Sequence, residues 1–188
     1  MGSYGSSHSQ FNRPTSVAIS PITKKIAISD CNNHRVQILN PDLTFSSSIG
    51  SKGSGNGQFN GPHDVAFDSA GNMYVTDPNN HRIQVFNSEG QFLRQFGKRG
   101  KGDGELNFPA GISIDSDDTV YVAEGSNHRV SVFTREGNFL TSFGSQGDGP
   151  GQFDGPYRII MDKNGTIYVA DSFNNRLQVF AKLFKSPH

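Results

Sequence analysis

The sequence has little of several features that would define other classes of protein. Cys31 is its only cysteine, so no disulfide forms within the chain and folding does not depend on oxidation. Lys and Arg (17) balance Asp and Glu (17), which argues against a strongly basic nucleic-acid-binding domain and against an acidic tail. No apolar run approaches the roughly 20 residues of a membrane helix, and residues 1–10 do not resemble a signal peptide. We therefore expect a cytoplasmic protein without membrane contact.

A repeated pattern dominates what is present. Four arginines recur every 47 residues, and four acidic residues, four prolines and three glycines keep nearly the same spacing. The repeated positions are Arg35, Arg82, Arg129 and Arg176; Asp30, Asp77, Glu124 and Asp171; Pro14, Pro62, Pro109 and Pro156; and Gly50, Gly97 and Gly144. Such a period is typical of arrays in which each repeat is a small structural unit that packs on its neighbours.

The second copy shows what one unit contains. Apolar and polar residues alternate over residues 64–68, 73–76, 82–86 and 91–96, and turn-forming residues separate these segments. Alternation with a period of two predicts β-strands, and no segment has a helical pattern. Four antiparallel strands in about every 40–50 residues predict an all-β fold built of four-stranded propeller blades.

The repeats divide the chain into three parts. We expect a flexible lead-in or connector at residues 1–10, a propeller at 11–181 and a tail at 182–188. The predicted blades span residues 11–50, 59–97, 106–144 and 153–181, and the last lacks a fourth strand. Because an open array leaves strand edges unpaired, we expect a closed four-bladed ring, part of a larger propeller, or self-association through the terminal blades.

Four short motifs carry a resemblance to a known family. In the second copy they are Pro-x-x-Val-Ala-x-Asp at 62–68, Tyr-Val-x-Asp at 74–77, Asn-His-Arg-Ile-Gln-Val-Phe at 80–86 and Phe-Gly at 96–97. This pattern resembles the NHL repeat, and is most similar to the C-terminal NHL domains of tripartite-motif (TRIM) ubiquitin ligases. The resemblance implies a propeller that binds protein or RNA on one face. The RING, B-box and coiled-coil segments of that family have no counterpart here, so we expect no ligase activity in this chain.

The repeated polar residues are interpreted as structural. An active site is asymmetric, whereas the acid–arginine pairs Asp30/Arg35, Asp77/Arg82, Glu124/Arg129 and Asp171/Arg176 occur in every copy. We expect each pair to tie strands two and three together by a hydrogen bond or ion pair. The repeated histidines, His34, His81 and His128, have no metal-ligand spacing and are predicted to pack in loops. We therefore predict no metal site and no cofactor.

Positions that differ between the copies predict a ligand face. Propeller topology places the loops between strands two and three, together with the connectors between blades, on one face. The candidates at the start of the inner strands and in these loops are His63, Asp64, Tyr157, Arg158, Phe173, Asn32 and Asn79. A basic cluster in one connector, Lys98, Arg99 and Lys101, is suited to phosphate contact. Acidic residues in the same connectors oppose that interpretation.

Non-catalytic recognition is the leading hypothesis for function. His63 and Asp64 form the only adjacent His–Asp pair, but no Gly-x-Ser-x-Gly elbow supplies a nucleophile. The first hypothesis is binding of a protein partner or ligase substrate through this face, and the balanced charge favours it over the second, RNA binding. The third is a lyase activity, because some NHL-like propellers are lyases that use a metal and several histidines. That histidine set is not visible here, so the chain is predicted not to be an enzyme.

Overall fold

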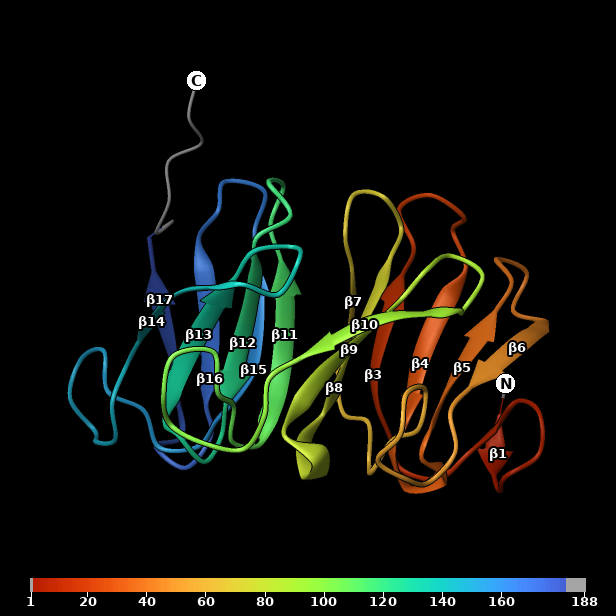
Figure 1. Ribbon diagram of the computed structural model, residues 1–188, viewed down its shortest axis with the longest axis horizontal. Helices are drawn as coiled ribbons and strands as arrows, with labels where there is room; N and C mark the ends of the chain where they lie inside the picture. The colour runs from red at the N-terminus through yellow and green to blue at the C-terminus, as the bar shows by residue number, and fades with distance from the viewer. Residues whose placement is uncertain (1, 182–188) are drawn as a thin grey trace.

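The computed structural model describes residues 2–181, and its regular secondary structure consists almost entirely of short β-strands (Figure 1). The strands form four successive antiparallel sheets, which are the blades of a propeller. In Figure 1 the blades follow one another from the red end of the chain on the right to the blue end on the left. This confirms the predicted all-β architecture.

Each blade keeps its strands in chain order, beginning with the inner strand. Blade 1 contains β3 (Pro14–Ile19), β4 (Ile26–Asp30), β5 (Arg35–Leu39) and β6 (Phe45–Ile49). Blade 2 contains β7 (Val65–Phe67), β8 (Met73–Asp77), β9 (Arg82–Phe86) and β10 (Phe92–Phe96). Blade 3 contains β11 (Pro109–Ile114), β12 (Val120–Glu124), β13 (Arg129–Phe133) and β14 (Phe139–Phe143). Blade 4 contains β15 (Pro156–Met161), β16 (Ile167–Asp171) and β17 (Arg176–Phe180).

The loops sort onto two opposite edges of the molecule. Because neighbouring strands are antiparallel, the loop between the second and third strands (the 2–3 loop) lies on the same side as the connector between blades. These segments follow the lower edge in Figure 1, and the hairpin turns follow the upper edge. We call the first edge the connector face. In blades 1 and 2 its 2–3 loops contain the 3-10 turns η1 (Cys31–Asn33) and η2 (Pro78–Asn80).

Three apolar clusters hold the blades together, one at each junction. Side chains alternate across a strand, so β8 sends Met73 and Val75 toward blade 1 and Tyr74 toward blade 3. A third cluster between blades 3 and 4 includes Tyr121 and Phe153. Each fully buried aliphatic or aromatic side chain contributes about 1.5–3 kcal/mol. The blades are therefore joined by packing of their faces rather than by shared strands.

The two end blades each have one bare face. All residues of β8 and β9 are buried, whereas burial alternates along β16 and β17. The exposed apolar side chains on the strands of the end blades include Val17 and Ile19 of β3, Ile160 of β15, and Leu177 and Val179 of β17. Within the described residues, blades 1 and 4 therefore each leave apolar side chains exposed to solvent.

The first residues pair with one another and with blade 1. β1 (Ser3–Tyr4) pairs in parallel with β2 (Gln10–Phe11), and the later connectors contain the same parallel pairing as single bridges, for example Lys52 with Phe59. The guanidinium of Arg35 donates hydrogen bonds to the carbonyl oxygens of Ser6, Ser7 and Gln10. Residues 2–13 thus have the structure of a connector. The predicted tail at 182–188 lies outside the described residues.

Candidate ligand-binding site

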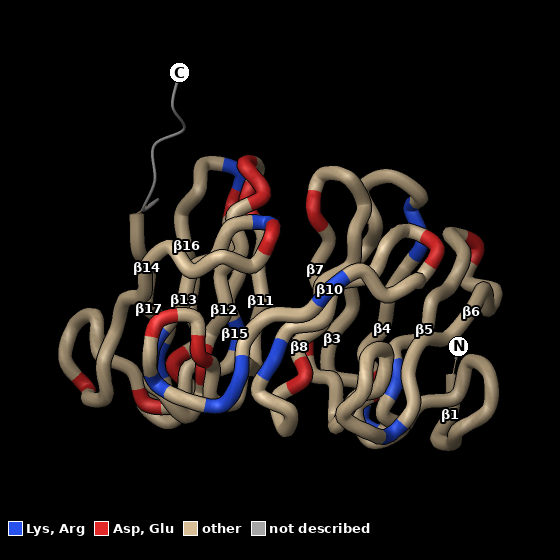
Figure 2. Tube along the Cα trace, in the orientation of Figure 1, with Lys and Arg blue, Asp and Glu red and all other residues tan. Residues whose placement is uncertain are grey.

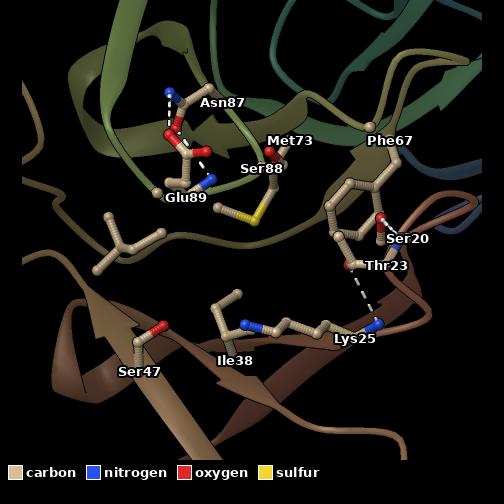
Figure 3. Close-up of a pocket in the computed structure, with 13 residues that line it drawn as sticks. Ser20, Thr23, Lys25, Ile38, Ser47, Phe67, Met73, Asn87, Ser88 and Glu89 are labelled. Atoms are coloured by element: carbon tan, nitrogen blue, oxygen red, sulfur yellow. Dashed lines mark hydrogen bonds between the residues drawn. The ribbon is translucent and has the colours of Figure 1, made fainter.

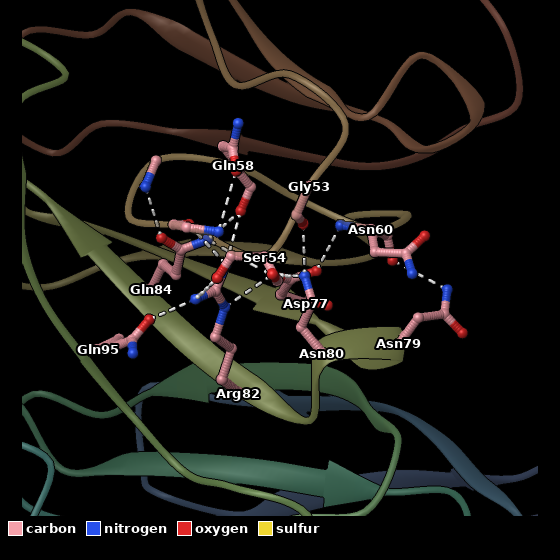
Figure 4. A network of polar contacts seen from close by, with 12 residues as sticks. Gly53, Ser54, Gln58, Asn60, Asp77, Asn79, Asn80, Arg82, Gln84 and Gln95 are labelled. Atoms are coloured by element: carbon pink, nitrogen blue, oxygen red, sulfur yellow. Dashed lines mark hydrogen bonds and ion pairs between the residues drawn. The ribbon is translucent and has the colours of Figure 1, made fainter.

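A repeated polar network fixes each 2–3 loop to the connector that precedes its blade. Figure 4 shows it in blade 2, where buried Asp77 accepts hydrogen bonds from the Asn60 amide (2.8 Å), Asn80 (2.8 Å) and Arg82 (2.9 Å). The guanidinium of Arg82 also donates to carbonyl oxygens of the connector, including that of Gln58. The other three acid–arginine pairs have the same geometry, at 2.7–2.8 Å. These side chains therefore act on the loop backbone, and leave the outward loop residues free to vary.

The repeated histidines link each loop to the next blade. The Nδ1 atoms of His34, His81 and His128 accept hydrogen bonds from the amides of Gly61, Phe108 and Gly155, at 3.1, 3.3 and 3.3 Å. Each of these amides belongs to the residue before a repeated proline. The Nδ1 of His128 also lies 3.3 Å from Asp154 Oδ1, in the connector that follows blade 3.

A buried carboxylate joins the inner strands at the centre of the connector face. Asp64 is fully buried, and it accepts hydrogen bonds from the Ser16 hydroxyl (2.5 Å) and from the amides of Val65 (2.8 Å) and Ile112 (2.9 Å). The guanidinium of Arg158 donates to the same carboxylate and to Ser16. Asp64 thus connects residues from all four blades. Arg158, predicted as a ligand contact, is already neutralised by this partner.

His63 and Tyr157 form a second bridge over the start of β11. The Nδ1 of His63 lies 3.1 Å from the Ala110 carbonyl oxygen, so it is the protonated nitrogen, and Nε2 accepts the Tyr157 hydroxyl at 2.6 Å. The two rings pack edge to face with centroids 4.6 Å apart. Burial lowers the pKa of His63 below its usual 6.5, which maintains this neutral tautomer. Tyr157 is the extra residue of a β-bulge in β15, a feature that redirects a side chain out of the strand pattern.

A pocket of about 400 Å³ lies between blades 3 and 4 on the connector face. It is lined by three aromatic residues, two serines and two glycines: Phe108, Tyr157, Phe173, Ser126, Ser172, Gly125 and Gly155. Phe173 is 75% exposed and Tyr157 37% exposed, so the rings face solvent. Its volume lies in the range of small-molecule and side-chain sites, about 300–1,000 Å³. We call it the aromatic pocket.

Phe108 has an unusual backbone conformation for its residue type. Its φ is +54°, in the left-handed region that costs most residues about 1–2 kcal/mol. The equivalent position before the proline is Gly61 (φ +72°) in blade 2 and Gly155 (φ +61°) in blade 4, where no such cost arises. Arg13 in blade 1 has φ +57°. Residues with such a strained backbone concentrate at binding sites, where the contact made by the side chain compensates for the strain.

The structure separates the predicted site residues into three groups. Tyr157 and Phe173 meet at the aromatic pocket, and His63, Asp64 and Arg158 form the polar support beside it. Asn32 and Asn79 bind their own connectors, at Asn12 and Asn60. Lys98, Arg99 and Lys101 lie in the connector between blades 2 and 3, and do not line the pocket. Phe108 was missed, although its alignment with two glycines was a usable signal.

Charge on the connector face is mixed rather than basic. Figure 2 shows residues of both signs along the lower edge of the molecule. Lys98 forms an ion pair with Glu105 at 3.4 Å, and the connectors also contain Asp148 and Asp154. This distribution gives little support to a continuous phosphate-binding surface.

A second cavity lies on the opposite edge, between blades 1 and 2 (Figure 3). Its walls include Lys25 and Ser47 from blade 1, and Met73 and Glu89 from blade 2. The volume is about 60 Å³, enough for a few water molecules but well below the size of a ligand site. We therefore assign no site there.

The repeats identify the family. The model of the NHL repeat matches residues 11–39, 59–86, 106–133 and 153–180, one segment in each blade. The chain belongs to the NHL repeat family. No curated protein matches this NHL repeat chain in a sequence search.

Solved structures share the fold of this NHL repeat chain at low sequence identity. A protein of unknown function from Bacteroides thetaiotaomicron is 17% identical with a TM-score of 0.69, over 89% of this chain and 47% of that one. A catalytically inactive virginiamycin B lyase from Staphylococcus aureus, solved with quinupristin, is 15% identical with a TM-score of 0.66, over 92% and 57%. An auxiliary nutrient binding protein from Bacteroides thetaiotaomicron gives 16% and 0.66, over 87% and 46%. The chain thus spans about half the length of these structures, and the similarity shows the fold alone.

Residues 2–181 contain neither a membrane-spanning helix nor a cluster of metal ligands. No helix in this part of the chain has the length and apolar character needed to cross a bilayer. Within the same residues, no three His, Cys, Asp or Glu side chains are placed together in a way that would hold a metal ion.

Proposed function

We propose that this chain is a non-catalytic recognition module that binds a protein partner through the connector face, at the aromatic pocket. The observation that carries the proposal is the exposure of Phe173 and Tyr157 around a pocket with no charged lining residue. Aromatic anchors in a pocket are the common centre of protein–protein interfaces. The polar networks beneath hold the loops rigid, which reduces the entropy lost on binding.

RNA binding through the same face is the alternative. Two of the cations that would contact phosphates have acidic partners, Asp64 for Arg158 and Glu105 for Lys98. A nucleobase would stack on the exposed rings, but its phosphates would find no unpaired cation in the lining of the pocket. These contacts favour a protein partner over RNA.

An enzymatic role is the weakest of the three hypotheses. His63 is buried and its two ring nitrogens are both engaged, one with Ala110 and one with Tyr157. It therefore has no nitrogen available to act as a base on a bound molecule. The similarity to the virginiamycin B lyase, at 15% sequence identity, shows a shared fold alone.

The finer parts of the proposal come from the sequence. The TRIM-like pattern suggests that the partner is a substrate or adaptor of a ubiquitin ligase whose catalytic segments are not in this chain. A cytoplasmic location agrees with the single cysteine.

Self-association through the end blades also stays a prediction. It is motivated by exposed Val17 and Leu177, and sedimentation at rising protein concentration measures it.

The test is site-specific cross-linking followed by reconstitution. A photoreactive phenylalanine analogue replaces Phe173, and a second sample carries it in place of exposed Leu93 on β10, the outer strand of blade 2. We expect a protein to be cross-linked from Phe173 only, and the purified partner to bind the unmodified chain saturably and the Tyr157→Ala/Phe173→Ala variant at least tenfold more weakly. RNA recovered at Phe173, with affinity that falls steeply with salt, would establish the alternative. Equal cross-linking from both positions would contradict a site at the pocket.

A further inference from the structure

The aromatic pocket has features that identify the kind of segment it accepts, if the proposed function is correct. We propose that it binds an uncharged, extended segment rich in proline, in the polyproline II conformation. The ligand's rings pack between Phe108, Tyr157 and Phe173, and its carbonyl oxygens accept hydrogen bonds from Ser126 and Ser172. Three independent observations lead to this ligand chemistry.

The first observation is the charge of the lining. Its side chains are aromatic rings, serine hydroxyls and glycines, and the nearby guanidinium of Arg158 donates to Asp64 and Ser16. An ionised ligand group buried here would lose hydration without gaining a partner of opposite charge. The part of the ligand inside the pocket is therefore uncharged.

The second observation is that three backbone amides around the pocket are already paired. The amides of Gly125 and Phe173 donate to the carbonyl oxygens of Phe108 and Asp154, and the amide of Gly155 donates to His128. These amides are not available to a ligand strand, which disfavours strand addition. The carbonyl oxygens of Phe108 and Asp154 already accept hydrogen bonds, so a ligand residue without an N–H is favoured. Polyproline II segments meet both conditions, because they are extended, lack internal hydrogen bonds and have few N–H groups.

The third observation is the placement of Phe108. The fold favours glycine at this position, as Gly61 and Gly155 show, yet blade 3 has an aromatic ring there. That ring is half-buried, and it is not among the residues of the three junction clusters. Arg13 has the same left-handed backbone in blade 1, and it does not line the pocket. Phe108 is thus a specificity-determining residue whose role is separable from folding.

The experiment compares Phe108→Gly with Arg13→Gly. Both substitutions relieve the same backbone conformation, so both variants are expected to fold, with unfolding midpoints equal to or above that of the parent chain. The probe is a fluorescein-labelled decaproline peptide, with an unlabelled decapeptide of Ala, Ser and Gly and a ten-nucleotide oligouridine as competitors in fluorescence anisotropy. We expect saturable binding of decaproline to one site, weakened at least tenfold by Phe108→Gly and changed less than twofold by Arg13→Gly. We also expect the alanine-rich peptide to compete at least tenfold less well than unlabelled decaproline.

Other outcomes overturn the inference in distinct ways. Equal losses in the two glycine variants would mean that Phe108 acts through folding, and equal competition by the alanine-rich peptide would remove the preference for proline. Stronger competition by oligouridine would replace the peptide with a nucleic acid. If decaproline does not bind while a partner still cross-links at Phe173, the proposed function stands and only the ligand class fails. If neither binds at the pocket, both fail.

Discussion

The junction between blades 1 and 2 and the junction between blades 3 and 4 share one backbone but have different surfaces. In the first, Asn79 and Cys31 lie beside Gly61, and a Cβ built on Gly61 would lie 3.1 Å from Asn79 Nδ2 and 3.6 Å from Cys31 Sγ. In the second, Gly125 stands where Cys31 is, and Phe173 stands where Asn79 is. The second crevice is open and becomes the aromatic pocket.

This difference shows where a repeat protein is free to change. The acid–arginine networks and the histidine contacts occur at both junctions and hold the loops in place. Since these groups fix the backbone, the outward loop residues determine the surface without determining the fold. A binding site therefore arises at one junction by substitution of a few side chains.

The largest expected effect comes from Asp64→Ala, which breaks the centre that both junctions share. The buried amides of Val65 and Ile112 would lose their acceptor, and the Arg158 guanidinium its counter-charge. We expect a loss of about 3–5 kcal/mol in the free energy of unfolding, measured by urea denaturation. Ser16→Ala, which removes one neutral partner of the same carboxylate, should cost only about 1 kcal/mol. Equal losses in the two variants would show that the carboxylate is not the centre of the network.

Filling the crevice between blades 3 and 4 should make that junction resemble the junction between blades 1 and 2. A Cβ on Gly125 would lie 3.3 Å from the Phe108 ring, so Gly125→Val places a branched side chain in the pocket. We expect at least tenfold weaker binding of labelled decaproline, about 1.4 kcal/mol, with an unfolding free energy changed by less than about 1 kcal/mol. The matched control is Cys31→Val at the first junction, which should leave binding unchanged. Binding retained in Gly125→Val would place the site elsewhere on the connector face.

A smaller effect is expected from Tyr157→Phe, which separates the ring of Tyr157 from its hydroxyl. The hydroxyl donates to His63 Nε2, and the ring lines the pocket. Removing the hydroxyl should cost about 1 kcal/mol and lower the melting temperature by about 2–4 °C, while decaproline affinity stays within twofold. A tenfold loss of affinity would mean that the hydroxyl contacts the ligand directly.

The smallest effect is the loss of stability in acid caused by protonation of His63, which joins blades 2 and 4 through its hydrogen bond with Tyr157. Burial lowers the pKa of His63 below 6.5, so the unfolded chain takes up the proton first as the pH falls. The stability contributed by neutral His63 is complete above about pH 6.5 and is lost below it, at no more than about 1.4 kcal/mol per pH unit. Melting curves between pH 7.5 and about 5 measure this slope. His63→Gln should flatten it without abolishing it, because burial also lowers the pKa of His81.

Much of the fold could be predicted because its information is local and repeated. Alternation over segments such as 82–86 identified the strands, and the recurrence of Asp77 and Arg82 in four copies indicated a structural pair. The order of residues 2–13 depends on Arg35, which is 28 residues away from Ser7 in the sequence, so no local pattern contains that contact. Chain order predicted which loops share a face, since antiparallel strands return the chain to the same edge.

The sequence by itself determined the blade, the period and the set of positions that vary on the connector face. Only the tertiary structure decided which of these positions meet. Tyr157 and His63 lie 94 positions apart in the sequence, and the packing of three blades brings them together. The tertiary structure likewise pairs Arg158 with buried Asp64, and the left-handed backbone before a proline singles out Phe108. Contacts between blades depend on the relative placement of whole sheets, which a pattern within one repeat does not contain.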